Sequence, residues 1–369
     1  MYLLLIISCV LLHETNSILQ YGHAYNVPGD FTSEEYATIA STFPIFTVEK
    51  RHAYEIYGNS SAPYPFKYNS IAASIGTARK IKALNSSVRV LMYWNSALHW
   101  DFYECEADVK PSWLLPPRHG YPAQEYNYSV PEFRAWWAAC AIGALRNSSG
   151  ALDGLFIDAV NKLSFNSYDL WGEMVDAIRA AVPHAFLIYN GNGYNHNDSV
   201  SANSSLLPHA DAVYLESTAN LVTDAEKDPP SIIIAYLQYL AASASADPSK
   251  LFFGKGHLTT SSQPDPNNPK TFTFGLAVFL LITPNPSTNY FISNDGYNID
   301  QGVLLPHAAY ELSFGMPLGE FSVNGAVLTR NFTNATVVVN LAAQTATIDM
   351  GLSFVKSSSV QEDVTGDNE

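Results

Sequence analysis

Basic residues are scarce in this sequence of 369 residues, which has 19 Lys and Arg against 34 Asp and Glu and a formal net charge of −15. The basic residues that are present form no run along the chain. Proteins that bind nucleic acids or anionic membranes use clustered positive charge to attract their partner. The composition therefore argues against both a nucleic acid and a membrane as a partner.

Several catalytic and cofactor motifs are also absent. The sequence contains no zinc-protease helix motif, no P-loop and no GxSxG elbow. Gly191-Asn192-Gly193 follows an apolar run, but it lacks the third glycine and the helix of a dinucleotide-binding fingerprint. The ten His residues are scattered along the chain. We therefore expect no cofactor and no built metal site.

Long apolar runs are rare, and the one at the N-terminus is too short to span a bilayer. Tyr2 to Leu12 is apolar and is followed by polar residues, with the small residues Thr15 and Ser17 before Ile18. This pattern predicts a signal peptide of residues 1–17. The missing basic n-region leaves a signal anchor as the alternative. The next longest apolar run, Phe274 to Thr283, is far too short to cross a membrane.

Cysteine is the scarcest residue, with three in the whole chain. Cys9 lies in the expected signal peptide, which leaves Cys105 and Cys140. A pair in an oxidising compartment suggests a disulfide. Cys140 also lies in an apolar helical stretch, where a buried free thiol is common, so both readings stay open.

Acceptor sites for N-glycosylation are frequent. Eight N-x-Ser/Thr sequons without an intervening Pro are headed by Asn59, Asn85, Asn127, Asn147, Asn197, Asn203, Asn331 and Asn334. Together with the N-terminal segment, they predict a eukaryotic protein that is secreted or lumenal.

Strand-like and helix-like stretches alternate through most of the chain. Helical patterns separate eight short apolar runs, and this rhythm is typical of a parallel α/β barrel. The expected strands are Ile18–Tyr25, Ile45–Glu49, Arg89–Asn95, Leu152–Val160, Ala185–Asn190, His209–Ser217, Leu251–Lys255 and Asn289–Ser293. We predict a (β/α)₈ TIM barrel over residues 18–315. Because three of the helices are weakly marked, an open doubly wound sheet is the alternative.

The pattern changes near residue 316. Four short stretches of alternating apolar and polar residues follow, and Asn324-Gly325 sits at one of the turns between them. These stretches predict a small antiparallel β appendage over residues 316–355. Residues 356–369 are Ser-rich and acidic, and we expect them to be disordered.

Two of the predicted strands end in a carboxylate. The Leu152–Val160 run reaches Asp158, and the His209–Ser217 run reaches Glu216. Active sites of α/β barrels lie at the C-terminal ends of the strands, and glycoside hydrolysis needs a pair of carboxyl groups at one site. Asp158 and Glu216 are therefore the candidate catalytic pair. The alternative for Asp158 is the cap of a following helix or turn.

Other polar and aromatic side chains follow the same strand ends and are candidates for binding a substrate. They are Glu49, Tyr93, Trp94, Asn190, Asn192, Lys255, Asn294 and Asp295. All of them except Tyr93 have a structural alternative. Glu49 can pair with Arg51, and Trp94 can fill the core. The three asparagines and Asp295 can make turns, and Lys255, with His257, can be an exposed loop residue.

At this point the residues resemble a known family. Asp153-Gly154-Leu155-Phe156-Ile157-Asp158 resembles the fourth strand of TIM-barrel glycoside hydrolases, and the nearest match is hypothetical glycosyl hydrolase family 15. Polygalactosaminidase-like barrels are a looser relative. The segment from Leu328 to Asn340 resembles the hairpin that closes such barrels, although Asn334-Ala335 stands where a glycine is common. The resemblance covers roughly residues 18–350 and implies a TIM barrel that hydrolyses a glycosidic bond in a carbohydrate.

The two carboxyls suggest a division of roles. A separation of about 5–5.5 Å favours retention of anomeric configuration, and about 6.5–9.5 Å favours inversion. We expect retention, with Asp158 as nucleophile and Glu216 as general acid/base, because a partly buried Glu can hold a proton near neutral pH. A barrel that binds carbohydrate without cleaving it is the alternative. A chitinase-like mechanism usually needs an acid at position 160, which is Val160.

The N-terminal prediction can be tested directly. Protein from a eukaryotic host should begin near Ile18 and should migrate faster on a gel after treatment with a glycosidase that removes N-glycans. N-terminal sequencing and the mobility shift measure the two effects, and a chain that retains Met1 and does not shift would refute both.

Overall fold

The computed structural model describes residues 17–26, 29–50, 52, 69–100, 102–117, 123–163, 167–191, 206–216, 229–256, 269–292, 297–299, 303–304 and 308–351. Several predictions fall outside these residues and stay predictions. They concern the signal peptide up to residue 16, the acidic tail, and the side chains of Asn59, Asn192, Asn197, Asn203, His257, Asn294 and Asp295.

Eight parallel strands form a closed barrel, in the order β1-β10-β9-β8-β7-β6-β3-β2. The strands are β1 (Leu19–Ala24), β2 (Ile45–Val48), β3 (Arg89–Asn95), β6 (Gly154–Asp158), β7 (Phe186–Asn190), β8 (Ala212–Leu215), β9 (Leu251–Lys255) and β10 (Tyr290–Ile292). Each lies within a run predicted from the sequence. The closed order confirms the TIM barrel and excludes an open doubly wound sheet.

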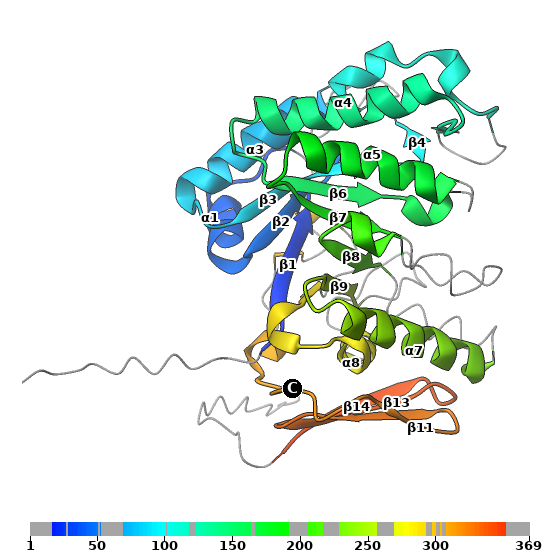
Figure 1. Cartoon of the computed structure of the whole chain (residues 1–369). Coiled ribbons are helices and arrows are strands. Elements are labelled where there is room, and N and C mark those ends of the chain that lie inside the picture. The colour runs from blue at the N-terminus through cyan, green and yellow to red at the C-terminus, as the bar shows by residue number, and fades with distance from the viewer. Residues whose placement is uncertain are drawn as a thin grey trace, which may run out of the picture.

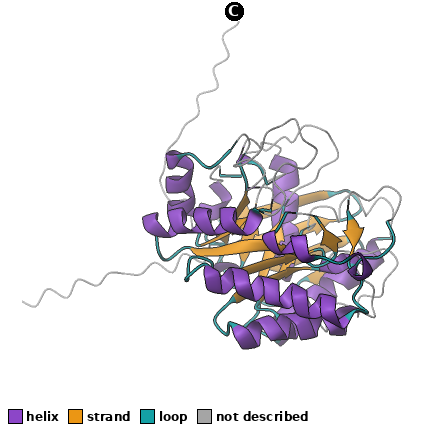
Figure 2. Cartoon of the chain, turned by 90° about the horizontal axis from the view of Figure 1, so that it is seen from above, coloured by secondary structure: helices purple, strands orange, loops and turns teal. Residues whose placement is uncertain are grey.

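Helices surround the strands (Figure 2). They are α1 (Ser33–Thr42), α3 (Ser70–Leu84), α4 (Pro131–Asn147), α5 (Tyr168–Ala181), α7 (Pro230–Ala246) and α8 (Pro269–Ile282). Thr32 begins α1 with a capping box. The Thr32 hydroxyl accepts from the backbone N–H of Glu35, and the Glu35 carboxylate accepts from the backbone N–H of Thr32. Within the described ranges, no helix is long and apolar enough to cross a membrane.

Acidic residues just before β6 and β8 satisfy backbone donors where the sheet begins. Asp153 accepts from the backbone N–H of Val90 at 2.7 Å, and Asp211 accepts from that of Leu187 at 2.8 Å. Each carboxylate also pairs with a basic residue, Lys82 and Arg179 respectively. Asp153 and Asp211, at the starts of these two runs, therefore have structural roles. Asp158 and Glu216, at the ends of the same runs, remain the candidates for the active site.

A four-stranded antiparallel sheet follows the barrel and lies against α8 (Figure 1). Its strands, in spatial order, are β11 (Ser322–Asn324), β12 (Val327–Asn331), β13 (Ala335–Asn340) and β14 (Thr345–Met350). Gly325 has a φ of 59° in the turn between β11 and β12, as the sequence Asn324-Gly325 favours. The predicted antiparallel appendage is therefore present.

Arg330 attaches this sheet to the barrel. Arg330 is 7% exposed as a whole residue, and its guanidinium donates to the carbonyls of Leu280, Leu281 and Thr283, at the end of α8, and to that of Gly319. The last carbonyls of a helix have no partner within the helix, and a cation there also complements the helix dipole. The arginine of the closing hairpin thus caps α8.

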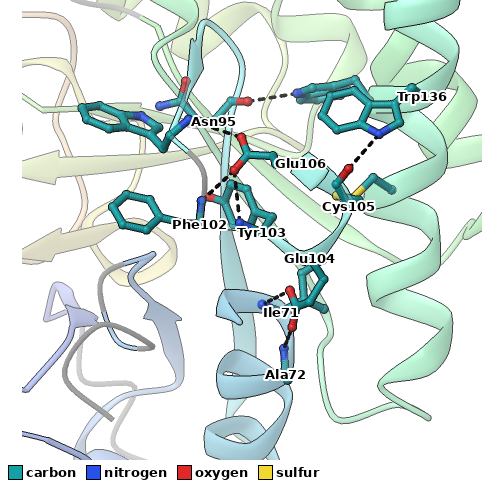
Figure 3. Close-up of a disulfide and its surroundings, with 12 residues drawn as sticks. Ile71, Ala72, Asn95, Phe102, Tyr103, Glu104, Cys105, Glu106 and Trp136 are labelled. Carbon is teal, nitrogen blue, oxygen red and sulfur yellow. Dashed lines mark hydrogen bonds between the residues drawn. A yellow bond between two sulfur atoms is a disulfide. The ribbon is translucent and has the colours of Figure 1, made fainter. Parts of the chain in front are cut away.

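The connection from β3 to α4 is held at three consecutive residues (Figure 3). The Glu104 carboxylate accepts from the backbone N–H groups of Ile71 at 2.9 Å and Ala72 at 2.7 Å, at the start of α3. Cys105 forms a disulfide with Cys140 of α4, with a Cα–Cα distance of 6.1 Å. The structure thus contains the bridge rather than two buried thiols. The disulfide ties the connection to α4, and Glu104 ties it to α3.

Glu106 is the third of these residues, and it is buried. Its carboxylate accepts from the backbone N–H groups of Phe102 at 2.7 Å and Tyr103 at 3.1 Å, and from the Tyr126 hydroxyl at 2.7 Å. Burial raises the pKa of Glu106 to about 7, although these hydrogen bonds oppose the shift. The connection after β3 therefore depends on a carboxyl group that titrates near neutral pH.

This pKa predicts how stability changes with pH. Between about pH 4.5 and 7 the folded chain keeps the Glu106 proton while the unfolded chain has released it, so the free energy of unfolding falls as pH rises, by roughly 3 kcal/mol from this group. Urea unfolding of the oxidised protein across this range should show a flatter profile for Glu106→Gln than for the wild type. Parallel profiles would contradict the prediction.

Candidate active site

Asp158 ends a strand that is otherwise buried. Its partner in the ladder of the neighbouring strand β3 is Asn95. The next residue, Ala159, has a left-handed backbone with a φ of 63° and is 1% exposed. Non-glycine residues in this conformation are strained and cluster at functional sites. The turn ends the strand at once and leaves the half-buried Asp158 carboxylate at the mouth of the barrel.

Asn190 connects the two candidate catalytic carboxyls. It ends β7, which lies between β6 and β8, and its side-chain nitrogen donates to Asp158 Oδ1 and to Glu216 Oε2, each at 2.7 Å. The two acceptor oxygens therefore lie no further apart than twice this distance, about 5.4 Å. Two residues from strands that are not neighbours are thus brought to one site.

Two further donors orient Asp158. The Tyr93 hydroxyl donates to Oδ2, and the Asn95 amide donates to Tyr93 at 2.9 Å and, more weakly, to the same Oδ2 at 3.5 Å. Burial and the nearby Asp158 and Glu49 charges raise the pKa of Tyr93 well above its ordinary value. Its phenol therefore remains a donor at neutral pH, and Asp158 is held from both sides.

Glu216 has more adaptable partners. The Tyr297 hydroxyl donates to Glu216 Oε1 at 3.1 Å and lies 3.4 Å from the Tyr214 hydroxyl. A hydroxyl can both donate and accept, so this chain can reverse its direction when Glu216 carries a proton. Burial, followed by Tyr214 and Glu216, raises the pKa of Tyr297 well above its ordinary value, which keeps the phenol protonated.

Aromatic donors fix the end of β3. The Trp137 indole donates to the Asn95 carbonyl at 2.9 Å, and the Tyr103 and Tyr128 hydroxyls donate to the carbonyls of Tyr93 and Ser96. A strand that ends inside a protein leaves backbone groups that need partners. Rigid aromatic side chains from α4 and the β3–α4 connection supply them, so the residues that hold Asp158 are fixed in place.

A pocket of about 260 Å³ opens above the two carboxylates. Its lining residues come from the C-terminal ends of the strands and from residue 297, and they are His23, Tyr25, Glu49, Lys50, Tyr93, Phe156, Asp158, Glu216 and Tyr297. Aromatic rings and polar groups thus line one opening together, which is typical of sites that bind small polar ligands.

The pocket also contains an ion pair. Glu49 is buried, and its carboxylate lies 2.6 Å from the ammonium group of Lys50, which stands 4.1 Å from the centre of the Tyr93 ring. Arg51, the partner considered from the sequence, lies outside the described residues. Glu49 is therefore both a member of the pocket and part of an ion pair, rather than one or the other.

His23 and Lys255 complete the electrostatics of the site. Burial, and then the charges of Lys255 and Lys50, hold the pKa of His23 well below its ordinary value, so its imidazole is neutral at neutral pH. Burial also lowers the pKa of Lys255, while Glu216 and Asp158 oppose the shift. The Lys255 ammonium stands 4.1 Å from the centre of the Tyr297 ring.

The structure corrects one candidate and adds others. Trp94 is 1% exposed and packs against Tyr103 and Trp137, so it fills the core and has no face left for a sugar. It shares β3 with Tyr93, but successive side chains of a strand point to opposite faces.

Some residues of the site were not predicted from the sequence, namely His23, Tyr25, Lys50, Asn95 and Tyr297. Polar residues at the end of the first strand were an available signal for His23 and Tyr25.

Metal ligands are not grouped at the pocket. Among the residues that the structure describes, no three His, Cys, Asp or Glu side chains are placed to hold one metal ion. The described pocket instead contains three carboxylates, of which Glu49 is paired with Lys50, while Asp158 and Glu216 share the Asn190 donor.

Solved structures that are similar to this chain include Eubacterium rectale Amy13B and Aspergillus fumigatus Ega3. Eubacterium rectale Amy13B is similar over 89% of this chain and 87% of its own, with 10% identity and a TM-score of 0.50, which supports the fold alone. Aspergillus fumigatus Ega3, in complex with galactosamine, aligns over 75% of this chain and 90% of its own, with 11% identity and a TM-score of 0.48. No curated protein matches.

A family model gives the stronger result. The model of hypothetical glycosyl hydrolase family 15 matches residues 82–336, more than half of the chain, and this match includes both candidate carboxyls and ends within the closing hairpin. The chain therefore belongs to hypothetical glycosyl hydrolase family 15 and is a TIM-barrel glycoside hydrolase.

Proposed function

We propose that this glycoside hydrolase is a secreted enzyme that cleaves an oligo- or polysaccharide with retention of anomeric configuration, using Asp158 and Glu216. One observation carries the proposal. Asn190 donates to both carboxyls, which limits the distance between the two acceptor oxygens to about 5.4 Å. Retaining enzymes have carboxyls about 5–5.5 Å apart, whereas inverting enzymes need about 6.5–9.5 Å to admit a water.

The proposed reaction has two steps. An Asp158 oxygen attacks the anomeric carbon, and the glycosidic C–O bond breaks as Glu216 gives its proton to the leaving oxygen. Water then attacks the same carbon and loses a proton to Glu216, and the bond between the sugar and Asp158 breaks. The second step restores both carboxyls to their starting states.

The hydrogen bonds support this assignment of roles. Asp158 accepts from Asn190, Tyr93 and Asn95, which hold it in one orientation, as a nucleophile requires. Glu216 instead faces the Tyr297 hydroxyl, which can accept as well as donate and so suits a group that gains and loses a proton. Position 160 is a buried valine, and it therefore supplies no acid for a chitinase-like mechanism.

Two features support secretion. The Cys105–Cys140 disulfide suits an oxidising compartment. Asn147 and Asn331, which each head a sequon, are exposed and so can carry glycans without disturbing the core.

Substitution of the two carboxyls should have unequal effects. A polysaccharide panel assayed for new reducing ends would first identify a substrate. Asp158→Asn should then abolish turnover on every substrate, because no covalent intermediate forms. Glu216→Gln should retain turnover of aryl glycosides with good leaving groups, because these need little protonation. The rates of both variants on both substrate types measure this, and near-normal activity of Asp158→Asn would refute the roles.

Asn190→Asp tests the shared donor. A third carboxylate would replace the group that holds Asp158 and Glu216 together, so kcat should fall by about a hundredfold or more while the protein stays folded. Asn324→Asp adds the same charge at the exposed turn of the C-terminal sheet and should leave kcat unchanged. If both variants kept the wild-type kcat, the amide would have no part in placing the carboxyls.

A further inference from the structure

A second and larger hollow lies on the same face of the barrel. It has a volume of about 530 Å³, against 260 Å³ for the catalytic pocket. Ala97 and Leu163, which follow β3 and β6, form part of its wall, and Leu170 of α5 faces them. We call this hollow the groove. Because β3 and β6 are neighbouring strands, the groove adjoins the part of the mouth that holds Asp158.

Asn95 links the groove to the catalytic pocket. Its side-chain nitrogen donates to Asp158, and its side-chain oxygen accepts from the backbone N–H of Ala97, which lines the groove, at 2.9 Å. Two residues of chain span at most about 7 Å. The two hollows are therefore close enough for one carbohydrate chain to occupy both.

Trp100 contacts the cluster of residues beside the groove and lies near a residue of the catalytic pocket. Its half-buried ring packs against Ala97, Leu98 and Ala159, and its centre is 5.7 Å from the ammonium group of Lys50, which lines the catalytic pocket. An aromatic face in this position suits the apolar face of a sugar ring.

The lining of the groove combines rigid aromatic residues with polar groups. The hydroxyls of Tyr126 and Tyr128 donate to Glu106 and to the Ser96 carbonyl, so both rings are fixed. Lys162, Asn127 and Ser129 add polar groups beside them. Apolar walls with a few polar groups are typical of sites for small polar ligands, and sugars present both apolar faces and hydroxyls.

We propose that the groove binds further sugar units of the chain whose glycosidic bond lies in the catalytic pocket, so that the preferred substrate is an oligo- or polysaccharide rather than the glycoside of a single sugar. This inference rests on the proposed function. It predicts that affinity rises with chain length until the groove is filled.

Leu163→Trp tests the groove because it places a large side chain in it. The probes are cello-, malto- and chito-oligosaccharides of increasing length, with binding measured by calorimetry in the Asp158→Asn background, where no hydrolysis occurs. The ratio of affinities for the longest and shortest members that bind should fall at least tenfold in Leu163→Trp. Leu84→Trp, at an exposed position at the end of α3, should keep the ratio.

The outcomes separate the two proposals. Affinity that does not rise with length, or a ratio that Leu163→Trp leaves intact, overturns the groove proposal. Should Leu163→Trp fail to fold, Lys162→Ala, at an exposed position, must lower the affinity for the longest members at least threefold. A series that binds with rising affinity but that the wild type never cleaves contradicts the proposed function alone, and failure to bind any series contradicts both.

Discussion

The site depends on one amide group placed between two carboxyls. Asp158 ends β6, Asn190 ends the neighbouring β7, and Glu216 directly follows β8, so barrel closure brings all three side chains to the same mouth. Two carboxyls so close repel each other when both are ionised. The Asn190 amide, which donates 2.7 Å hydrogen bonds to both, offsets this repulsion and fixes the spacing on which a retaining mechanism depends.

The surrounding structure keeps this arrangement rigid by satisfying the ends of strands and helices with side chains from distant parts of the sequence. Trp137 of α4 reaches the Asn95 carbonyl, and Arg330 of the C-terminal sheet caps α8. Glu104, beside the disulfide, caps the other kind of helix end, because it accepts from the first N–H groups of α3. Each partner replaces the water that would otherwise bind an exposed backbone group. The high content of Tyr and Trp thus supplies hydrogen-bond donors as well as core volume.

Much of the fold could be predicted from the sequence, because a buried parallel strand is a short apolar run and the eight runs are separated by clear breaks. The pair Asp158 and Glu216 followed from the same pattern, since an acid at the end of such a run lies at the mouth of the barrel. The partners of these carboxyls did not follow. Asn190 reads equally well as a turn residue, and Tyr297 comes from a segment without a recognisable pattern. Trp94 shows the remaining limit, because the two faces of a fully buried strand look alike in sequence.

The shared Asn190 donor holds Asp158 and Glu216 at the spacing of a retaining enzyme. The most direct test is the stereochemistry of the first product, followed by proton NMR during hydrolysis of an oligosaccharide or aryl glycoside that the enzyme cleaves. The newly released sugar should first appear with the anomeric configuration of the substrate and should mutarotate only later. Initial release of the opposite anomer would contradict a retaining mechanism.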